Sequence, residues 1–330
     1  MKVKVSELKA KMTSVLKAKG YSDEDIPFVI NMYLGGELRG HTSHGLSSFA
    51  AFAQINPTEQ PEPVILRDTH AMLVLDAKGA NGNILGKHIA DEALKRAKAE
   101  GVGTVLVHDL DSWLRPGAIA EYIAQQGYVA TVINSGGGTS VAPPGGFDPV
   151  IGTNPIAYGI PTNDEPLVVD MATAMHAWGQ VRLANKYGTH LPPDAFYDDH
   201  GTITRDGKEA YSVKAAGDYK GFALGLLVEV LCGSLVDIPM MLTSTAGSTF
   251  NGKIPNRGAV VTVYDPGVMI DPAEFKQRNS KLLADIQNSQ ALPGETIRIP
   301  GVHAGELQAA RTKDDSLDIP DELWEEIRGL

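Results

Sequence analysis

Residues 37–45 carry the groups best suited to acid–base chemistry. They read Glu-Leu-Arg-Gly-His-Thr-Ser-His-Gly, so His41 and His44 stand three residues apart, just after an expected helix. Histidine exchanges protons near neutral pH, and the glycine after His44 frees the backbone that presents the ring. The alternative interpretation is a turn with two surface histidines. This segment is the first candidate for a catalytic site.

Glycine-rich stretches with isolated polar residues form a second candidate region. The chain has 35 glycines, about a dozen more than average usage of roughly 7% would give. The relevant stretches are residues 134–146, 152–161, 170–174 and 219–221. Small residues and exposed backbone amides suit an extended ligand that bears phosphates. Lys220 opens an expected helix, so its ammonium group and the helix N-terminus would act at one anion site. Taken singly, the alternatives are that Asp170 caps a turn and that Lys220 is a solvated lysine.

Common nucleotide and metal motifs are missing from the sequence. No glycine cluster has the G-x-G-x-x-G spacing of a Rossmann turn. Residues 247–253 match the G-x-x-x-x-G-K part of a P-loop, but Ile254 stands where a Ser or Thr should bind magnesium, and Pro255 follows it. No H-E-x-x-H, no G-x-S-x-G and no tight cluster of carboxylates or histidines that would demand a metal is present. We therefore expect neither an NTPase nor a metal site.

Composition restricts the partners of the chain. It has 330 residues, a formal net charge of −11 and one cysteine, Cys232. Negative charge without a long Lys/Arg run disfavours nucleic-acid binding, and a lone cysteine excludes a disulfide scaffold. The longest apolar stretch, residues 222–231, contains Glu229 and is far shorter than the ~20 residues of a membrane span. We expect a cytoplasmic protein that binds neither nucleic acid nor a membrane.

Strands and helices alternate along the expected structure, which indicates an α/β fold. Helices are predicted over residues 5–38 (as two helices), 84–99, 119–126, 220–235, 272–289 and 320–328, and residues 180–215 are expected to form a helix followed by a long irregular segment. Strands are predicted over residues 64–66, 71–76, 102–107, 128–133, 154–160, 166–170 and 259–264. The helix over residues 220–235 is apolar on nearly every side, so we expect it to be buried.

The order of four motifs resembles the malate/L-lactate dehydrogenase family of NAD(P)-dependent oxidoreductases. The motifs are R-G-x-x-S-H-G from residue 39, G-T-N-P-x-A from residue 152, D-M-A-T-A from residue 170 and Y-K-G from residue 219. This non-Rossmann family includes ureidoglycolate dehydrogenase, diketogulonate reductase, sulfolactate dehydrogenase and piperideine-2-carboxylate reductase. The resemblance implies a helical substrate and dimerisation domain, residues 1–75 with about 275–330, and a mixed α/β domain for NAD(P), residues 76–274.

The resemblance also implies roles for individual residues. His44 would donate a proton to the substrate during reduction and remove it in the reverse direction, while Ser43 and Asp170 would orient and polarise its ring. The cofactor, NAD or NADP, would lie along Ser135, Gly136, Asp170, Met171, Ala172, Thr173, Lys220, Gly221 and His303. The cofactor would supply the hydride, and the protein would position it, exclude water and supply the proton.

The sequence departs from the family pattern at two positions. Many members have an arginine where this chain has Ser48, and an arginine can pair with a substrate carboxylate through two hydrogen bonds. Many also have a histidine where this chain has Ser112. We expect Arg115 to replace the missing arginine, with Ser48, Ser112 and Trp113 as further substrate-binding residues.

The expected activity is the interconversion of a small 2-oxo acid and 2-hydroxy acid with NAD or NADP, in a homodimer as in the family. One alternative is the reduction of a cyclic imino acid of the piperideine or pyrroline-2-carboxylate type. Another is a substrate that lacks the carboxylate, which Ser48 suggests. A third is a nucleotide-binding relative without catalysis, suggested by the loss of both the arginine and the second histidine.

Overall fold

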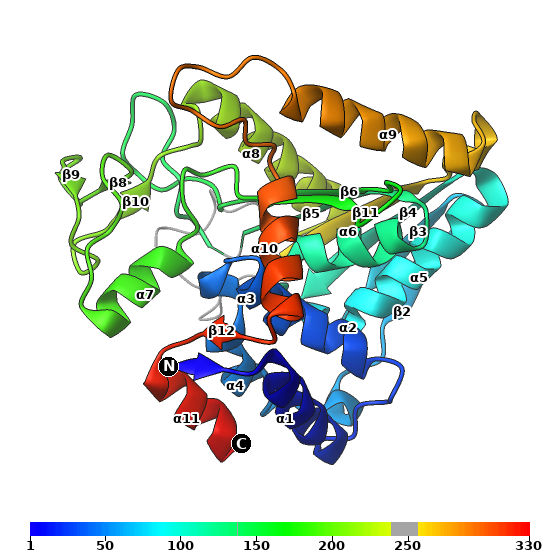
Figure 1. Cartoon of the computed structure of the whole chain (residues 1–330), viewed down its shortest axis with the longest axis horizontal. Coiled ribbons are helices and arrows are strands. Elements are labelled where there is room, and N and C mark those ends of the chain that lie inside the picture. Colours follow the sequence, from blue (N-terminus) through cyan, green and yellow to red (C-terminus); the bar gives the residue numbers. More distant parts are fainter. Residues whose placement is uncertain (137, 239–256) are drawn as a thin grey trace.

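The computed structural model describes residues 1–136, 138–238 and 257–330 of the chain. The P-loop-like segment, residues 247–253, lies outside these described residues. Figure 1 shows a central sheet surrounded by helices. The α/β class expected from the sequence is confirmed.

A mixed seven-stranded sheet forms the centre of the fold (Figure 1). In spatial order its strands are β2 (Val64–Asp68), β3 (Met72–Asp76), β4 (Val102–Leu110), β11 (Arg257–Tyr264), β5 (Val129–Asn134), β6 (Ile156–Ile160) and β7 (Leu167–Met171). Strands β3 and β4 run parallel, and every other neighbouring pair is antiparallel. The carboxyl ends of β4 and β5 therefore meet the beginning of β11 at one edge of the sheet.

Helices cover both faces of this sheet. They are α5 (Gly82–Glu100) and α6 (Pro116–Gln125) on one face, and α8 (Tyr219–Cys232) on the other. Successive side chains of a strand point to opposite faces. Val261 of β11 thus belongs to the large core that contains α5 and α6, whereas its neighbour Val260 packs beside Cys232 of α8. Both faces of the central strand are consequently buried.

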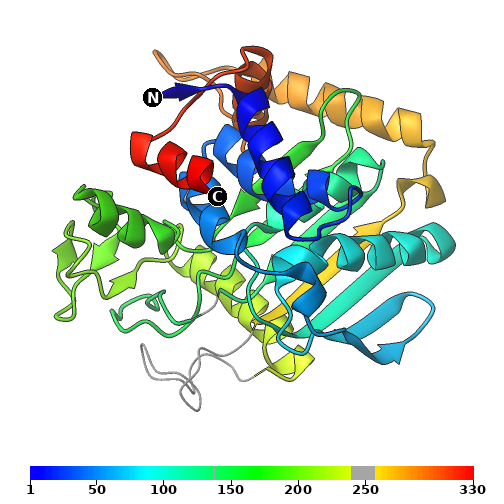
Figure 2. The same cartoon turned by 90° about the horizontal axis from the view of Figure 1, so that it is seen from below.

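The two ends of the chain meet at one side of the molecule (Figures 1 and 2). Strand β1 (Lys2–Val3) pairs with β12 (Leu317–Asp318), and the amino group of Met1 donates a hydrogen bond of 2.7 Å to the carbonyl of Ile319. The surrounding helices are α1 (Val5–Ala18), α4 (Phe49–Phe52) and α11 (Asp321–Gly329). The N-terminal and C-terminal segments therefore fold together, as the predicted helical domain requires.

The second predicted helix contains a π-helical turn. It comprises α2 (Ile26–Ile30), a π-helix (Asn31–Gly35) and α3 (Gly36–Leu38). Gly35 lies so close to the Asn31 side chain and to Arg115 that a Cβ atom there would collide with Asn31. Such insertions are frequent at functional sites, and this one lies directly before the His41–His44 segment.

Helix α8 differs from the prediction, because much of its surface is exposed. Leu224, Leu226, Leu227 and Val230 are 42%, 47%, 53% and 42% exposed. The 18-residue window Tyr219–Val236 has a mean hydropathy of 1.6, and 39% of it is buried. By length and composition alone it could cross a membrane, so the apolar stretch is longer than the sequence analysis recognised. In the structure the opposite side of α8 contacts β11 and β5.

Several described elements were not predicted. They are α10 (Val302–Lys313) and a small sheet of β8 (Phe196–Tyr197), β9 (Ile203–Thr204) and β10 (Ser212–Val213). Helix α7 (Gly179–Tyr187) is the helix expected within residues 180–215. Helix α9 (Pro272–Gln287) was also predicted, and it ends two residues before the predicted end. Strands β2 and β3, which precede residue 76, belong to the central sheet. The proposed division into two domains stays a prediction.

Candidate active site

Two glycines and a buried carboxylate hold the loop that carries His44. His44 ends a short 3-10 turn directly after α3. The backbone amide of Leu46 donates a hydrogen bond of 3.0 Å to Glu37 Oε2. A Cβ on Gly45 would collide with the same carboxylate, and a Cβ on Gly36 would lie 2.9 Å from the His44 carbonyl. The close approach of α3 to the loop therefore requires glycine at both positions.

His44 sits in an electropositive, largely buried setting. Its Nδ1 lies 2.8 Å from the Ser43 hydroxyl, which agrees with the pairing expected from the sequence. Burial is the main cause that lowers the pKa of His44 to about 4. Four neighbouring groups lower it further: His41, Arg182, Arg257 and Arg115. The imidazole is therefore neutral at pH 7, which is the form that accepts a proton.

Asp170 interacts electrostatically with His41. Its Oδ2 accepts a hydrogen bond of 2.9 Å from the backbone amide of Gly117. Burial raises the pKa of Asp170, and the charge of His41 is among the groups that oppose this shift. Among the described residues, no hydrogen bond joins Asp170 to Ser43 or His44. The role of Asp170 in orienting His44 stays a prediction.

Arg115 forms part of a buried ionic cluster. Its Nη2 donates a hydrogen bond of 2.9 Å to the Asn31 carbonyl and lies 3.7 Å from Glu121 Oε2. The other oxygen of Glu121 accepts a 2.8 Å hydrogen bond from Arg39 Nη2. Burial alone would raise the pKa of Glu121, but the two guanidinium groups hold it below its usual value. Arg115 is only 2% exposed, so its proposed contact with a substrate carboxylate stays a prediction.

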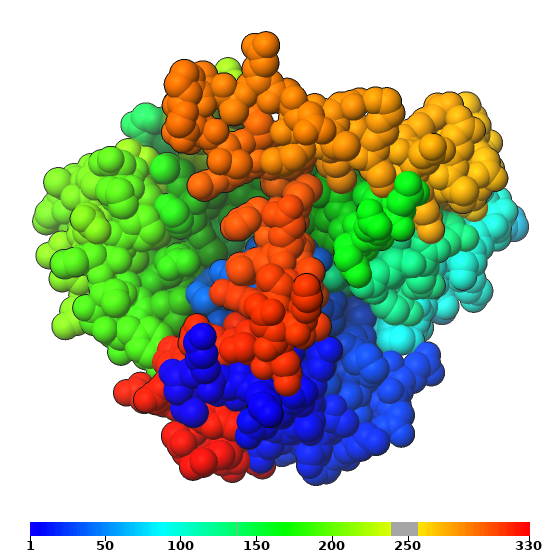
Figure 3. All heavy atoms as spheres, viewed as in Figure 1, coloured from blue at the N-terminus to red at the C-terminus, as the bar shows by residue number. Residues whose placement is uncertain are grey.

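Three adjoining cavities surround His44. The main cavity, of about 710 Å³, includes His44, Ser48, Ser112, Trp113, Arg182 and Arg257 in its walls. A second cavity of about 300 Å³ shares His44 and adds His41, Arg115 and Asp170. A third, of about 110 Å³, extends from Asp170 to Gly301 at the start of α10. The surface is hollowed beside α10 in Figure 3.

The three other predicted substrate-binding residues lie together in the main cavity. They are Ser48, Ser112 and Trp113. The Ser112 hydroxyl accepts a hydrogen bond of 2.8 Å from Asn81 Nδ2. The buried indole nitrogen of Trp113 and the buried Oδ1 of Asn134 have no hydrogen-bond partner in the described part of the chain. Both residues line the main cavity, while these two atoms themselves are shielded from solvent.

Asn154 of the G-T-N-P motif fastens the loop at Gly136. The Gly136 amide donates a 2.9 Å hydrogen bond to Asn154 Oδ1. The Nδ2 of Asn154 donates to the Gly225 carbonyl at 2.9 Å and to Glu229 Oε2 at 2.8 Å, both in α8. Asn154 is fully buried. Its position explains the motif as a structural link that places Gly136 in the wall of the main cavity.

The predicted cofactor residues fall into separate groups. Gly136 lines the main cavity, Asp170 and Ala172 line the second, and Met171 lines the third. Ser135 and Thr173 are buried behind these walls, where their backbone amides donate to the carbonyls of Gly258 and Thr153 at 3.1 and 3.0 Å.

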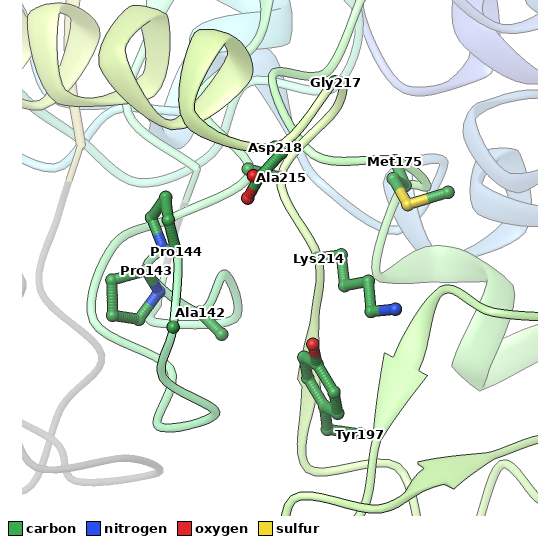
Figure 4. Close-up of a pocket in the computed structure, with 10 residues that line it drawn as sticks. Ala142, Pro143, Pro144, Met175, Tyr197, Lys214, Ala215, Gly217 and Asp218 are labelled. Carbon is green, nitrogen blue, oxygen red and sulfur yellow. The ribbon is translucent and has the colours of Figure 1, made fainter.

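Lys220, Gly221 and His303 lie outside the cavities around His44. Lys220 and Gly221 begin α8, beside another cavity of about 400 Å³ that Lys214, Gly217 and Asp218 help to line (Figure 4). His303 is exposed, with its Nδ1 3.9 Å from Glu306. Their cofactor contacts stay predictions.

Sequence reasoning gave no individual role to three charged or titratable residues of this region. His41 lines the second cavity, although the sequence analysis assigned it no role. Arg182 and Arg257 line the main cavity from α7 and from the start of β11. The spacing of the two histidines was a usable signal for His41. The two arginines gave none, because neither belongs to a recognisable motif.

Comparison with known proteins agrees with the resemblance noted in the sequence. Residues 3–328 match the family model described as malate/L-lactate dehydrogenase. The chain is 27% identical to L-sulfolactate dehydrogenase of Methanothermobacter thermautotrophicus over 322 residues, which cover 96% of this chain and 92% of that protein. It is 25% identical to 2,3-diketo-L-gulonate reductase of Escherichia coli over 341 residues, which cover all of both proteins.

The fold leads to the same family. The structure of sulfolactate dehydrogenase from Methanocaldococcus jannaschii superposes with a TM-score of 0.83 at 26% identity, covering 100% of this chain and 96% of that one. The expected non-Rossmann fold is confirmed by this likeness. The chain therefore belongs to the malate/L-lactate dehydrogenase family, and it is an oxidoreductase of that family.

Proposed function

We propose that the protein interconverts a small 2-oxo acid and the corresponding 2-hydroxy acid with NAD or NADP, using His44 as proton donor and acceptor. The observation that carries this proposal is the position of His44, which lines both of the larger adjoining cavities and contacts Ser43 through Nδ1. That contact leaves Nε2 for the substrate. The relatives named sulfolactate dehydrogenase and diketogulonate reductase support the substrate class.

The walls of the cavities fit a nicotinamide cofactor. A dinucleotide is long, and the three cavities adjoin one another from the main cavity at Gly136 to Gly301. Trp113 and Asn134 in the wall of the main cavity each have a buried polar atom, a donor and an acceptor, without a partner among the described residues. When bound, the cofactor supplies or takes the hydride. Gly136, Asp170, Met171 and Ala172 would hold it.

Charge in the main cavity supports an anionic substrate. Its described lining contains three cationic side chains, Arg182, Lys186 and Arg257, and one acidic side chain, Asp111. The chain as a whole carries a net charge of −11, so this wall is positive within an acidic protein. A cavity lined by one sign of charge attracts ligands of the opposite sign. A carboxylate bound here would also offset the positive charges that lower the pKa of His44.

In the proposed reaction each residue has a limited task. During reduction, His44 Nε2 gives a proton to the oxygen of the substrate carbonyl while the carbon receives the hydride. In the reverse direction the neutral ring takes the proton from the hydroxyl. The Ser43 hydroxyl fixes the ring through Nδ1. The buried walls of the cavity limit access of water to the reacting atoms.

The pH dependence of kcat/KM should follow the low pKa of His44. For reduction, kcat/KM should fall roughly tenfold per pH unit above the pKa, because the proton donor is the charged ring. For oxidation, the neutral ring is the base, so kcat/KM should be level from about pH 5 upward, above the pKa of about 4. Profiles in both directions between pH 4 and 8 test this. A reductive profile independent of pH would contradict it.

The central test combines nucleotide binding and turnover. Binding of NADH and NADPH is measured by fluorescence, and their oxidation is followed with oxaloacetate, pyruvate, sulfopyruvate, 2,3-diketogulonate and piperideine-2-carboxylate. Turnover of an oxo acid supports the proposal, whereas turnover of the cyclic imine alone supports the imino acid reductase. Binding without turnover of any compound supports the relative without catalysis. Failure to bind either nucleotide rejects all three.

We also propose that the protein is a cytoplasmic homodimer formed through α8. The exposed residues Leu224, Leu226, Leu227 and Val230, here called the α8 stripe, carry no charge. Exposed apolar patches commonly mark protein or membrane contacts. A twofold dimer places the same patch of both copies together and buries it. This arrangement explains the apolar window without a membrane.

A charge in the α8 stripe should dissociate the dimer. Leu227→Glu would bury a carboxylate against apolar side chains, which is unfavourable without a partner. We expect the mass measured by sedimentation, without detergent, to shift from two chains to one. The matched control is Met269→Glu, which changes an 89% exposed residue elsewhere and should leave the mass unchanged. A dimer that survives Leu227→Glu would refute this interface.

A further inference from the structure

Arg257 lies at a bulge where three segments of the sheet edge meet. It opposes Leu110 at the end of β4, while Ala259 opposes Val107, so the register shifts between them. A bulge changes the direction of the strand and of nearby side chains. Gly258, inside the bulge, accepts a 3.1 Å hydrogen bond from the Ser135 amide at the end of β5. The sheet itself therefore fixes the position of Arg257.

The guanidinium of Arg257 is held at the wall of the main cavity. Its Nη1 donates a hydrogen bond of 3.1 Å to the Trp113 carbonyl. This carbonyl is its one hydrogen-bond partner among the described residues, and it carries no charge. A guanidinium has five N–H donors. Most of the hydrogen-bonding capacity of Arg257 thus remains available within the described site, although the carboxylate of Asp111 in the same cavity acts on its charge from beyond ion-pair distance.

The other arginines beside His44 are placed differently. Arg115 is engaged by Glu121 and by the Asn31 carbonyl in the buried cluster. Arg182 is exposed on α7 and donates a 3.3 Å hydrogen bond to the Ser43 carbonyl. Arg257 combines partial burial with the absence of a carboxylate within ion-pair distance in the described part of the chain. Partial burial strengthens an ion pair with a ligand, because water screens it less.

We propose that Arg257 binds the carboxylate of the substrate, in place of the arginine that Ser48 replaces. Arg257 and Ser48 line the same cavity as His44. A carboxylate held there by two hydrogen bonds has a fixed orientation. The carbonyl carbon next to the carboxylate of a 2-oxo acid then lies in the same cavity as His44. This assignment rests on the proposed function and differs from the clamp predicted at Arg115.

The test compares Arg257→Gln and Arg257→Lys with the control Arg328→Gln, a change of an exposed residue in α11. Calorimetry with oxalate, a small unreactive carboxylate, measures anion binding to the protein without nucleotide. We expect Arg257→Gln to weaken oxalate binding about 10- to 100-fold, as for loss of a hydrogen bond to a charged group. Lysine should restore part of it, because it keeps the charge but not the paired geometry. Equal affinity in Arg257→Gln and the wild type would overturn the assignment.

Kinetics add a readout that a purely structural role would not change. Wild-type protein should reduce a 2-oxo acid with a higher kcat/KM than the uncharged amide of the same acid. This ratio should fall at least tenfold in Arg257→Gln and stay unchanged in the control. Should that variant not fold, the same ratio in Arg257→Lys decides, and an unchanged ratio overturns the assignment. A third outcome separates the two proposals: the wild type binds oxalate through Arg257 but reduces none of the oxo acids. That result would reject the proposed function and support the anion site.

Discussion

Replacing His44 by alanine is expected to reduce kcat for the oxo acid by about 10²- to 10⁴-fold, the usual contribution of a general acid. The reason is that His44 lines both larger cavities and is held by Ser43, with Nδ1 2.8 Å from its hydroxyl. Its Nε2 is the proposed proton donor. The measurement is steady-state reduction with NADH or NADPH, together with nucleotide affinity, which should change little.

The matched control for this prediction is His70→Ala. The His70 side chain is 96% exposed, and it lies outside the cavities around His44. It should keep wild-type kcat and wild-type nucleotide affinity. Unchanged kcat in His44→Ala would remove His44 from the reaction. Loss of nucleotide affinity with kcat retained would instead assign it to binding. His41→Ala is informative beside both, because His41 lies with Asp170 in the second cavity.

Replacing Glu121 by alanine is expected to reduce the free energy of unfolding by about 3–5 kcal/mol. Glu121 is 2% exposed and accepts a 2.8 Å hydrogen bond from Arg39, and its other oxygen lies 3.7 Å from Arg115. Alanine would leave two buried guanidinium groups without their shared carboxylate. Urea unfolding at pH 7, where the carboxylate is charged, measures the loss.

The control removes an exposed ion pair of similar chemistry. Glu325 pairs with Arg328 in α11 at 2.6 Å, with both side chains more than half exposed. Glu325→Ala should cost less than about 1 kcal/mol, because water screens exposed pairs. Similar losses in both variants would show that burial does not strengthen the Glu121 cluster. Glu121→Gln removes the charge beside Arg115. If this variant folds and keeps the wild-type KM, Arg115 supports structure rather than substrate binding.

Periodic patterns predicted most of the central sheet and its covering helices. Strand β3 (Met72–Asp76) and helix α9 (Pro272–Gln287) lie within one or two residues of their predicted ranges. Side chains repeat every second residue in a strand and about every 3.6 residues in a helix, so burial on one side leaves a readable pattern. The helix α10 was missed because Val302 and Leu307 are its only large apolar residues, too few to mark such a pattern.

Helix α8 shows where pattern reasoning fails. Its composition correctly indicated an apolar helix, but burial within the same chain was inferred and is wrong for the α8 stripe. An apolar face requires a partner, and composition does not state whether that partner is the rest of the chain, a second copy or a lipid. Only the packing of α8 against one face of the sheet shows which side remains exposed.

The sequence by itself determined the α/β class, the family and the adjacency of Ser43 and His44, because these depend on local pattern, motif order and neighbouring residues. Tertiary structure decided which charges face His44. Arg115, Arg182 and Arg257 come from distant parts of the chain, and all three lower its pKa. Their approach depends on strand order, on a π-helical turn and on a bulge in β11. Such long-range contacts leave no periodic signal, because the spacing between the residues in sequence is unrelated to their separation in space.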